Sequence, residues 1–248
     1  MNGFENAADD YEQHRPSYPP LAIDWLVQAL RIGPDSMVLD LAAGTGKLTR
    51  LLVPYAGHLV AVEPAEAMRR QLETSVPGVQ AVEGTAESIP LATDSIDAAV
   101  VGQAFHWFDG ATATAEIGRV LRPEARLGLI WNIRDESTEA QARLARLLRR
   151  YRGPSPTYRN SGWASAFDDS PVFGPLRTTE VPSVHRLDRR GIIGLVMSIS
   201  YMPGLPPSDR DTAAAEAGAI FDDFADDDGL VSLSYNTRVY WTTVRKRD

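Results

Sequence analysis

The sequence contains no cysteine among its 248 residues. Disulfide bonds, zinc–thiolate centres and a cysteine nucleophile are therefore excluded, although the absence of cysteine does not itself establish a reducing compartment. Long apolar runs are missing too, since the longest, at 37–43 and 98–101, have the length of a strand and fall far short of a bilayer span. The first ten residues are acidic and lack the apolar region of a signal peptide, so we expect a cytoplasmic protein with no membrane partner.

Positive charge is also scarce, with 25 Lys and Arg residues against 33 Asp and Glu and a net charge of −8. A surface field of this sign repels polyanions, and tight nucleic-acid binding needs a cationic face that neutralises several phosphates. We therefore expect no nucleic-acid partner and a small-molecule substrate. The composition, 44% hydrophobic and 23% charged, suits one sizeable core, in a protein expected to be a monomer or a homodimer.

Apolar and amphipathic segments alternate over the first half of the chain. Short apolar runs predict buried strands, and apolar residues at helical spacing predict the helices between them. Strands that alternate with helices of this length imply a parallel sheet with helices on both faces. The predicted strands are 37–41, 58–62, 79–82, 96–101 and 127–131, and the predicted helices are 21–30, 47–53, 65–73 and 111–121.

The pattern changes after Trp131. We expect an aromatic, Pro-rich stretch with little periodicity at 153–175 and, further on, a break at 203–207. The other predicted elements are helices at 140–151 and 191–200, a strand at 178–187 and a closing antiparallel strand at 232–244. The region 153–207 is interpreted as a substrate cover, since loops on a rigid scaffold commonly carry specificity. Its candidate pocket residues are Trp163, Phe167, Met197, Tyr201 and Met202.

The most informative segment is 38–46 (VLDLAAGTG), where a buried strand turns through small residues into a helix. Such a turn lets a ligand approach the backbone, at the edge of an open α/β sheet where ligands bind. A phosphate-binding P-loop is excluded because Leu41 stands where its first glycine is needed and Leu48 follows Lys47. A dinucleotide fingerprint needs a small residue where Thr49 stands, so NAD is the less favoured ligand.

A carboxylate closes the next predicted strand, because Glu63 follows the apolar run that ends at Val62. A glutamate in this place can accept hydrogen bonds from both hydroxyls of a ribose, as expected for an unphosphorylated adenosine. The alternative is an acid that only caps a helix or is solvated. We favour the ribose role because the glycine turn precedes Glu63 at a suitable spacing.

Five segments, in this order, resemble the successive motifs of class I S-adenosylmethionine-dependent methyltransferases. They are 40–46, Glu63, 84–91 (GTAESIPL), 103–107 (QAFHW) and 116–123 (EIGRVLRP). The opening segment 11–19 and the closing segment 235–240 resemble the branch that includes trans-aconitate methyltransferases.

The resemblance implies a Rossmann-like, doubly wound α/β fold. Its seven-stranded sheet would be mostly parallel with one antiparallel strand, and a substrate-covering insertion would follow strand 5. One methyltransferase domain would span 1–248. Its parts would be an N-terminal lid segment (1–20), a cofactor-binding core (21–135), a substrate cover with helices (136–230) and a closing strand (231–248).

The resemblance also implies S-adenosylmethionine as cofactor, S-adenosylhomocysteine as product, and a role for each matching position. The turn residues would line the methionyl part of the cofactor, Glu63 would hold the ribose, and Pro64 and Met68 would pack near the adenine. Arg15 would meet the cofactor carboxylate in a charge-assisted pair. The turn residues are Ala42, Gly44, Thr45 and Gly46. The N–H of Ala86 would donate to the adenine ring, with Glu87 nearby. Gln103 and Ala104 would lie over the sulfonium, and Tyr11 would fold across the cofactor together with Arg15.

Three positions depart from the family pattern. Ala42 replaces the usual first glycine, which a small residue can do if its φ is negative. Thr85 stands where many relatives carry an Asp for the adenine amino group, so this contact is not expected. The pair Glu124-Ala125 replaces a common Gly-Gly at a turn away from the site.

Methyl transfer from a sulfonium is an in-line displacement, for which a protein mainly supplies alignment, desolvation and sometimes a base. His106, just past the fourth predicted strand, is the candidate catalytic residue and general base. No metal is expected, since the acidic run 222–229 does not match a calcium loop. Candidate aromatic neighbours of the methyl group are Tyr11, Tyr18, Phe105, Trp107 and Phe108.

Two alternatives share the same binding motifs. One is an enzyme that uses the cofactor in a cyclisation or rearrangement without methylating, and the other is a regulatory module that binds the cofactor without catalysis. Fold resemblance by itself does not choose among these functions.

Overall fold

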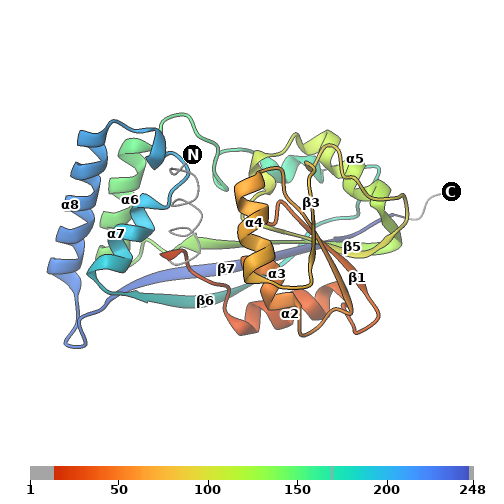
Figure 1. Ribbon diagram of the computed structural model, residues 1–248, viewed down its shortest axis with the longest axis horizontal. Coiled ribbons are helices and arrows are strands. Elements are labelled where there is room, and N and C mark those ends of the chain that lie inside the picture. Colours follow the sequence, from red (N-terminus) through yellow and green to blue (C-terminus); the bar gives the residue numbers. More distant parts are fainter. Residues whose placement is uncertain (1–13, 169, 246–248) are drawn as a thin grey trace. The chain divides into compact units, whose positions relative to one another are not determined.

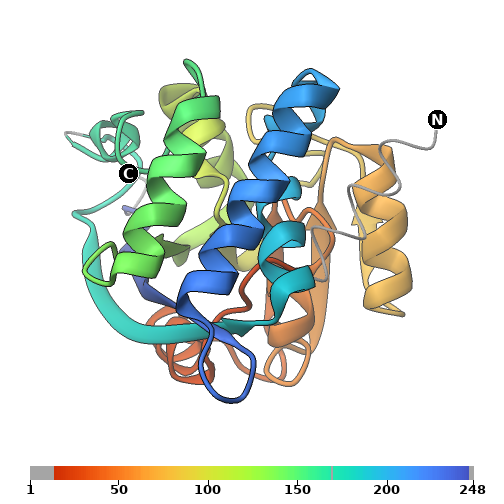
Figure 2. The same ribbon diagram turned by 90° about the vertical axis from the view of Figure 1, so that its left-hand side faces the viewer.

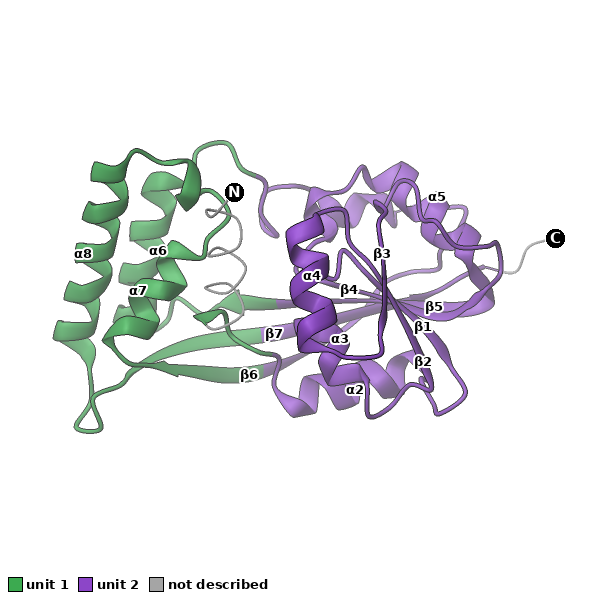
Figure 3. Cartoon of the chain, in the orientation of Figure 1, with its two compact units in different colours: residues 1–17, 132–155, 182–236 green, residues 18–131, 156–181, 237–248 purple. Residues whose placement is uncertain are grey.

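The computed structural model describes residues 14–168 and 170–245 (Figure 1). The chain divides into two compact units (Figure 3). Unit 1 comprises residues 1–17, 132–155 and 182–236, and unit 2 comprises residues 18–131, 156–181 and 237–248. The boundaries expected from the sequence, at residues 20, 135 and 230 of a single domain, stay a prediction.

Seven strands form one sheet in the order β3-β2-β1-β4-β5-β7-β6. Parallel pairing joins β3 to β2, β2 to β1, β1 to β4 and β4 to β5. The sheet strands are β1 (Met37–Leu41), β2 (His58–Val62), β3 (Gln80–Val82), β4 (Ile96–Gly102), β5 (Leu121–Arg134), β6 (Arg177–Leu187) and β7 (Val231–Thr243).

The last strand runs against β5. The Asp135 N–H donates to the carbonyl of Ser234, whereas the Val244 N–H donates to the carbonyl of Ala125, so residue numbers rise along one segment as they fall along the other. The predicted doubly wound α/β sheet of seven strands, mostly parallel with an antiparallel closing strand, is therefore confirmed.

In unit 2, alternation along the strands buries both faces of the sheet. Val38, Val100 and Ile130 point to one face, where α2 (Pro20–Leu30) and α3 (Lys47–Leu52) contribute Leu26 and Leu52 to the same core. The odd-numbered residues of β1, β4 and β5 point to the opposite face and are also buried: Leu39, Leu41, Ala99, Val101, Leu127, Leu129 and Trp131. The remaining helices of this unit are α4 (Glu66–Ser75), α5 (Gly110–Val120) and the short 3-10 turns η1 (Phe105–Trp107) and η2 (Trp163–Ala166).

Among the described residues of unit 1, three α-helices pack together (Figure 2): α6 (Glu139–Tyr151), α7 (Arg189–Met197) and α8 (Pro207–Phe224), with η3 (Met202–Gly204) between the last two. The predicted apolar stripe of α6 is buried at Leu144, Leu147 and Leu148. None of the helices in the described ranges is long and apolar enough to cross a membrane.

Helix α8 was not predicted from the sequence, and it contains Asp222 and Asp223, the first two residues of the acidic run 222–229. Both residues lie near the end of α8, where they form ion pairs with Arg189 and Arg143. The buried face of α8 consists largely of small residues such as Ala213 and Ala217, so the apolar periodicity is weak although alanine favours helices.

Gly57, which precedes β2, gives a test of how tightly unit 2 is packed. A Cβ atom at this position would lie 1.7 Å from the carbonyl oxygen of Pro34, a backbone atom that cannot rotate away. We expect Gly57→Ala to lower the free energy of unfolding by about 2 kcal/mol or more because the two loops must separate.

The control is Gly33→Ala, at a position where an added Cβ meets no atom within 4 Å. This variant should change the free energy of unfolding by no more than about 0.5 kcal/mol. Urea unfolding of both variants measures the difference, and equal stabilities would contradict the close approach.

Candidate active site

The candidate site lies where the order of the strands reverses. From β1 the chain proceeds to β2 and β3 on one side, and β4 then pairs with β1 on the other side, with Val38 opposite Ala98 and Asp40 opposite Val100. The carboxyl ends of parallel strands meet at one edge of a sheet, and ligands bind in the crevice at such a switch point. The segments after β1, β2 and β4 therefore converge here, and all belong to unit 2.

The turn after β1 has an unusual backbone. Gly44 and Gly46 have φ values of 58° and 84°, and Ala42 has a φ of 56°. The expectation of a negative φ at Ala42 is thus wrong: this alanine adopts the left-handed conformation, which costs about 1–2 kcal/mol for a residue with a Cβ. Gln103, directly after β4, also has a positive φ of 61°. Non-glycine residues held in this conformation cluster at functional sites.

The two glycines of the turn differ in the space around them. A Cβ at Gly44 would meet no atom within 4 Å, so the backbone there borders open space. A Cβ at Gly46 would lie 2.9 Å from Cγ of Leu72 and 3.0 Å from Cγ2 of Val76. The turn is therefore backed by α4 and the residue after it on one side, and leaves room for a ligand beside Gly44.

Glu63 joins the loop after β2 to this turn. Its Oε2 accepts a hydrogen bond from the Gly44 N–H (3.0 Å) and its Oε1 accepts one from the Ala65 N–H (2.9 Å). The residue is 8% exposed. Each carboxylate oxygen has two lone pairs, so each can accept one further hydrogen bond. Arg69 donates to the backbone carbonyls of Glu63 and Pro64 and thereby holds the same loop.

Asp40 is a site residue whose role the sequence did not reveal. Its Oδ2 accepts a 2.6 Å hydrogen bond from the Thr49 hydroxyl, whereas its Oδ1 is buried and has no hydrogen-bond partner in the described part of the chain. Burial, together with the negative charge of Glu63, raises the pKa of Asp40 to about 7. The available signal was an acid near the end of a buried strand that leads into a glycine turn.

The segment between β3 and β4 forms another side of the site. Ala86 is buried, and the two residues Thr85 and Ser88 exchange backbone hydrogen bonds around it. The carboxylate of Glu87 accepts a hydrogen bond from the Asp109 N–H at 3.0 Å, so it ties this segment to the one after η1. On the neighbouring α4, Met68 is half-buried.

His106 lies in η1, after Gln103 and Ala104, which are half-buried at the end of β4. The Nε1 of Trp131, at the end of β5, lies 3.4 Å from Nδ1 of His106. Burial lowers the pKa of His106 to about 4, so the imidazole is neutral at pH 7.

Trp131 belongs to an aromatic cluster of unit 2, which we define as Phe105, Trp131, Tyr158, Trp163, Phe167 and Tyr240. Ring centroids within it lie 4.6–6.5 Å apart. Two of the expected cover residues, Trp163 and Phe167, are thus beside the end of β5, whereas Met197, Tyr201 and Met202 pack in the core of unit 1. Among the other candidate aromatics, Tyr18 is buried and Trp107 is 53% exposed.

The remaining predicted positions fall outside unit 2 or outside the described residues. Arg15 belongs to unit 1, where its guanidinium donates to the hydroxyl and the backbone carbonyl of Ser198 at 3.1 and 3.3 Å. Tyr11 lies outside the described residues. Within those residues, no group of three acidic or histidine side chains could hold a metal ion.

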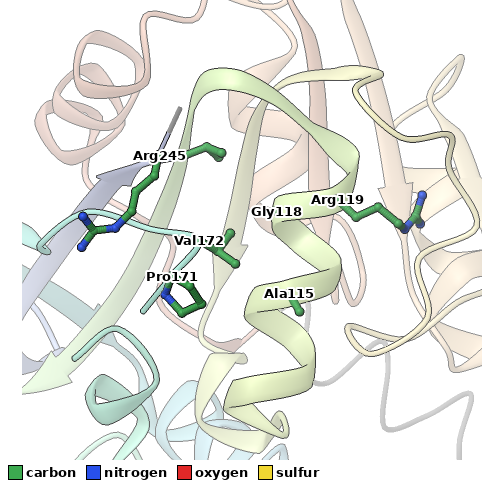
Figure 4. A pocket seen from close by; sticks show the side chains of 7 residues that line it. Ala115, Gly118, Arg119, Pro171, Val172 and Arg245 are labelled. Atoms are coloured by element: carbon green, nitrogen blue, oxygen red, sulfur yellow. The ribbon is translucent and has the colours of Figure 1, made fainter. Parts of the chain in front are cut away.

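A cavity of about 330 Å³ lies elsewhere in unit 2 (Figure 4), between α5 and the segment around Val172. Arg119 and Arg245 border it, but both guanidinium groups donate to backbone carbonyls, of Ile89 and Leu91 and of Ser170 and Phe173 respectively. None of the predicted site residues lines this cavity, so it is separate from the candidate site.

Comparison with known proteins identifies the family of this chain. Residues 39–129 match the methyltransferase domain family. An uncharacterised methyltransferase-like protein of Schizosaccharomyces pombe is 34% identical over 221 residues, which are 89% of this chain and 86% of that protein. The chain belongs to the methyltransferase family.

Other comparisons agree with this assignment. An uncharacterised methyltransferase of Mycobacterium tuberculosis is 53% identical to this methyltransferase over 133 residues, about half of each chain. The solved structure of a protein from Anaeromyxobacter dehalogenans, provisionally described as a type II methyltransferase, shares the fold with a TM-score of 0.71 and 23% identity, over 94% of this chain and 99% of that one.

The methyltransferase uses S-adenosylmethionine as its cofactor. The residues present fit this molecule, which carries a cationic amino group, a ribose and an adenine. Open space borders Gly44, the Glu63 oxygens keep acceptor capacity, and the buried Oδ1 of Asp40 has no partner among the described residues. A cation or a hydrogen-bond donor beside such an oxygen would offset the cost of its burial.

The raised pKa of Asp40 predicts a pH-dependent effect on stability. Between about pH 4 and pH 7 the folded protein holds a proton on this carboxyl that the unfolded chain has released, so this group makes folding less favourable as the pH rises. Asp40→Asn removes this loss. Between pH 5 and pH 8 the free energy of unfolding of the variant should rise relative to that of the unmodified protein by about 3 kcal/mol, which appears as a relative increase in the unfolding temperature.

The exposed Asp35→Asn serves as the control for the loss of one negative charge. Thermal unfolding of the three proteins over this pH range is the measurement. A stability difference between the Asp40 variant and the unmodified protein that does not change with pH would contradict the raised pKa.

Proposed function

We propose that this methyltransferase transfers the methyl group of S-adenosylmethionine to an oxygen, nitrogen or carbon nucleophile of a small molecule. One observation carries the proposal: Glu63 accepts hydrogen bonds from Gly44 and Ala65 and so brings a carboxylate with spare acceptor capacity to an open glycine turn. The pair makes a cradle for an adenosine without phosphates, because the turn admits a ligand to the backbone and supplies no cation for a phosphate.

The proposed cofactor contacts are those that the resemblance to class I methyltransferases implies. Backbone at the turn lines the methionyl part, and Glu63 accepts from the ribose hydroxyls. Pro64 and Met68 flank the adenine, and the N–H of Ala86 donates to it, with Glu87 nearby. Gln103 and Ala104 cover the sulfonium. Tyr11 and Arg15 form the lid segment, in which Arg15 pairs with the cofactor carboxylate. The turn residues are Ala42, Gly44, Thr45 and Gly46.

In this reaction the protein does not need to form a covalent bond with either substrate. Since the bound cofactor supplies a methyl group on a good leaving group, the chain's residues orient the acceptor in line with that group and exclude water. His106 is the proposed catalytic residue on the acceptor side, half-buried after β4. The aromatic cluster beside it supports an acceptor that is small and partly apolar.

Two further observations support a small-molecule acceptor. The net charge of −8 disfavours nucleic acid. The segments 11–19 and 235–240 resemble the trans-aconitate methyltransferase branch, so small organic acids belong in the first panel of acceptors to test. We further propose a single-domain cytoplasmic enzyme, a monomer or a homodimer, with no nucleic-acid or membrane partner.

Replacement of Glu63 tests the ribose contact. Glu63→Ala should weaken S-adenosylhomocysteine binding by about tenfold or more, because two hydroxyl hydrogen bonds to a charged acceptor are lost. Calorimetric titration measures the affinity. The matched control is Glu66→Ala, an exposed residue at the start of α4 that pairs with Arg70. Unchanged affinity in a folded Glu63→Ala protein would refute the assignment.

The reaction itself is tested with labelled S-adenosylmethionine and a panel of small acids, phenols and amines. We expect one acceptor to gain a single methyl group, with S-adenosylhomocysteine formed in equal amount, as followed by mass spectrometry. Binding of the cofactor without turnover across the panel, but with methylation of a protein or nucleic acid, would overturn the small-molecule proposal.

A further inference from the structure

The contact between His106 and Trp131 determines more than the position of the histidine. An indole N–H can donate a hydrogen bond but cannot accept one. The imidazole atom that faces it, Nδ1 at 3.4 Å, must therefore present its lone pair to Trp131. Since burial keeps the imidazole neutral at pH 7, its single proton resides on the other nitrogen, Nε2.

Trp131 is well suited to impose this arrangement because its own ring cannot turn. It is 1% exposed, and Trp163, Tyr158 and Tyr240 surround it with ring centroids at 4.6, 5.3 and 5.9 Å. Trp163 in turn donates to the backbone carbonyl of Tyr158 at 3.1 Å. The indole N–H is thus held toward His106 by rings that are themselves anchored.

A histidine in this state makes a poor base. The only lone pair of the ring, on Nδ1, faces the indole N–H, and the other nitrogen already carries a proton and can only donate. We propose that His106 acts as a neutral hydrogen-bond donor through Nε2–H, which orients an accepting atom of the methyl acceptor, and that Trp131 is the positioning residue that selects this tautomer. The inference rests on the proposed function of the crevice at the end of β4.

The electron and proton balance of the transfer agrees with this role. The bond between carbon and sulfur breaks with its electron pair left on sulfur, and the new bond forms from a lone pair of the acceptor. The acceptor attacks as a carboxylate or phenolate that has already released its proton to water, or as a neutral amine whose methylated product releases a proton to water afterwards, so no proton passes to His106. The Nε2–H is expected to hold the acceptor through a second lone pair, or through a neighbouring oxygen, while the attacking lone pair points at the methyl carbon.

Nitrogen-15 NMR of the histidine side chains in the full-length protein tests the tautomer directly, with the His106 signals assigned by their loss in His106→Gln. We expect the Nε2–H form at pH 7 in the unmodified protein, and a mixture of both tautomers in Trp131→Phe. The matched control is Phe167→Leu, which alters the same aromatic cluster at a ring in contact with Phe105, Trp163 and Phe173 and not with Trp131, and which should retain the Nε2–H form. A charged or Nδ1–H imidazole in the unmodified protein would overturn the proposal.

Kinetics with the labelled cofactor and the panel of acids, phenols and amines supplies the second readout. The amide of His106→Gln can still donate from a place near Nε2, whereas it cannot act as a base. We expect this variant to keep kcat within about tenfold, and His106→Ala to lose about 100-fold, the usual cost of removing a donor at a reacting centre.

Equal losses in the two His106 variants would indicate a base and overturn the donor role. If the unmodified protein itself turns over no member of the panel, the proposed function has failed. The NMR result then decides the tautomer separately, because it needs no acceptor.

Discussion

The site depends on one carboxylate that is shared between two loops. Glu63 accepts from the Gly44 N–H with one oxygen and from the Ala65 N–H with the other, so the segments after β1 and β2 cannot move apart without breaking the hydrogen bond to Gly44. The turn itself is not relaxed, since Ala42 and, after β4, Gln103 hold left-handed backbone conformations. A sheet edge that imposes such strain needs a strong local tie, and Glu63 supplies it before any ligand binds.

Much of the fold could be predicted from the sequence because the buried strands of a parallel sheet are short, continuous apolar runs. Strand β1 and strand β2 were predicted with their observed ends, and the helices between strands to within a few residues. Helix α8 was not predicted because its buried side consists largely of small residues, which give no clear apolar stripe in the sequence. The predicted start of β5 is too late, because the segment 121–126 contains a proline and three charged residues and only its pairing with β4 shows that it belongs to the strand.

The site was predictable in its chemistry more than in its geometry. The glycine turn and Glu63 could be found from spacing, and the structure places them in hydrogen-bond contact. The positive φ of Ala42 could not be predicted, because the surrounding strands impose the turn even though a residue with a Cβ is strained in this conformation. The sequence also did not predict that the buried Oδ1 of Asp40 has no partner among the described residues, or that an indole faces His106, because Trp131 lies 25 residues further along the chain.

The alanine-lined side of α8 has a consequence for how unit 1 tolerates mutation. Ala213 and Ala217 are fully buried, and their small side chains mark where α8 packs closely against its neighbours; the Arg189 guanidinium near Gly218 can move aside. Conservative exchanges that merely enlarge a side chain, such as alanine to valine or leucine, are therefore more damaging there than polar changes on the outer side. Along this helix, bulk rather than hydrophobicity limits which sequences can evolve.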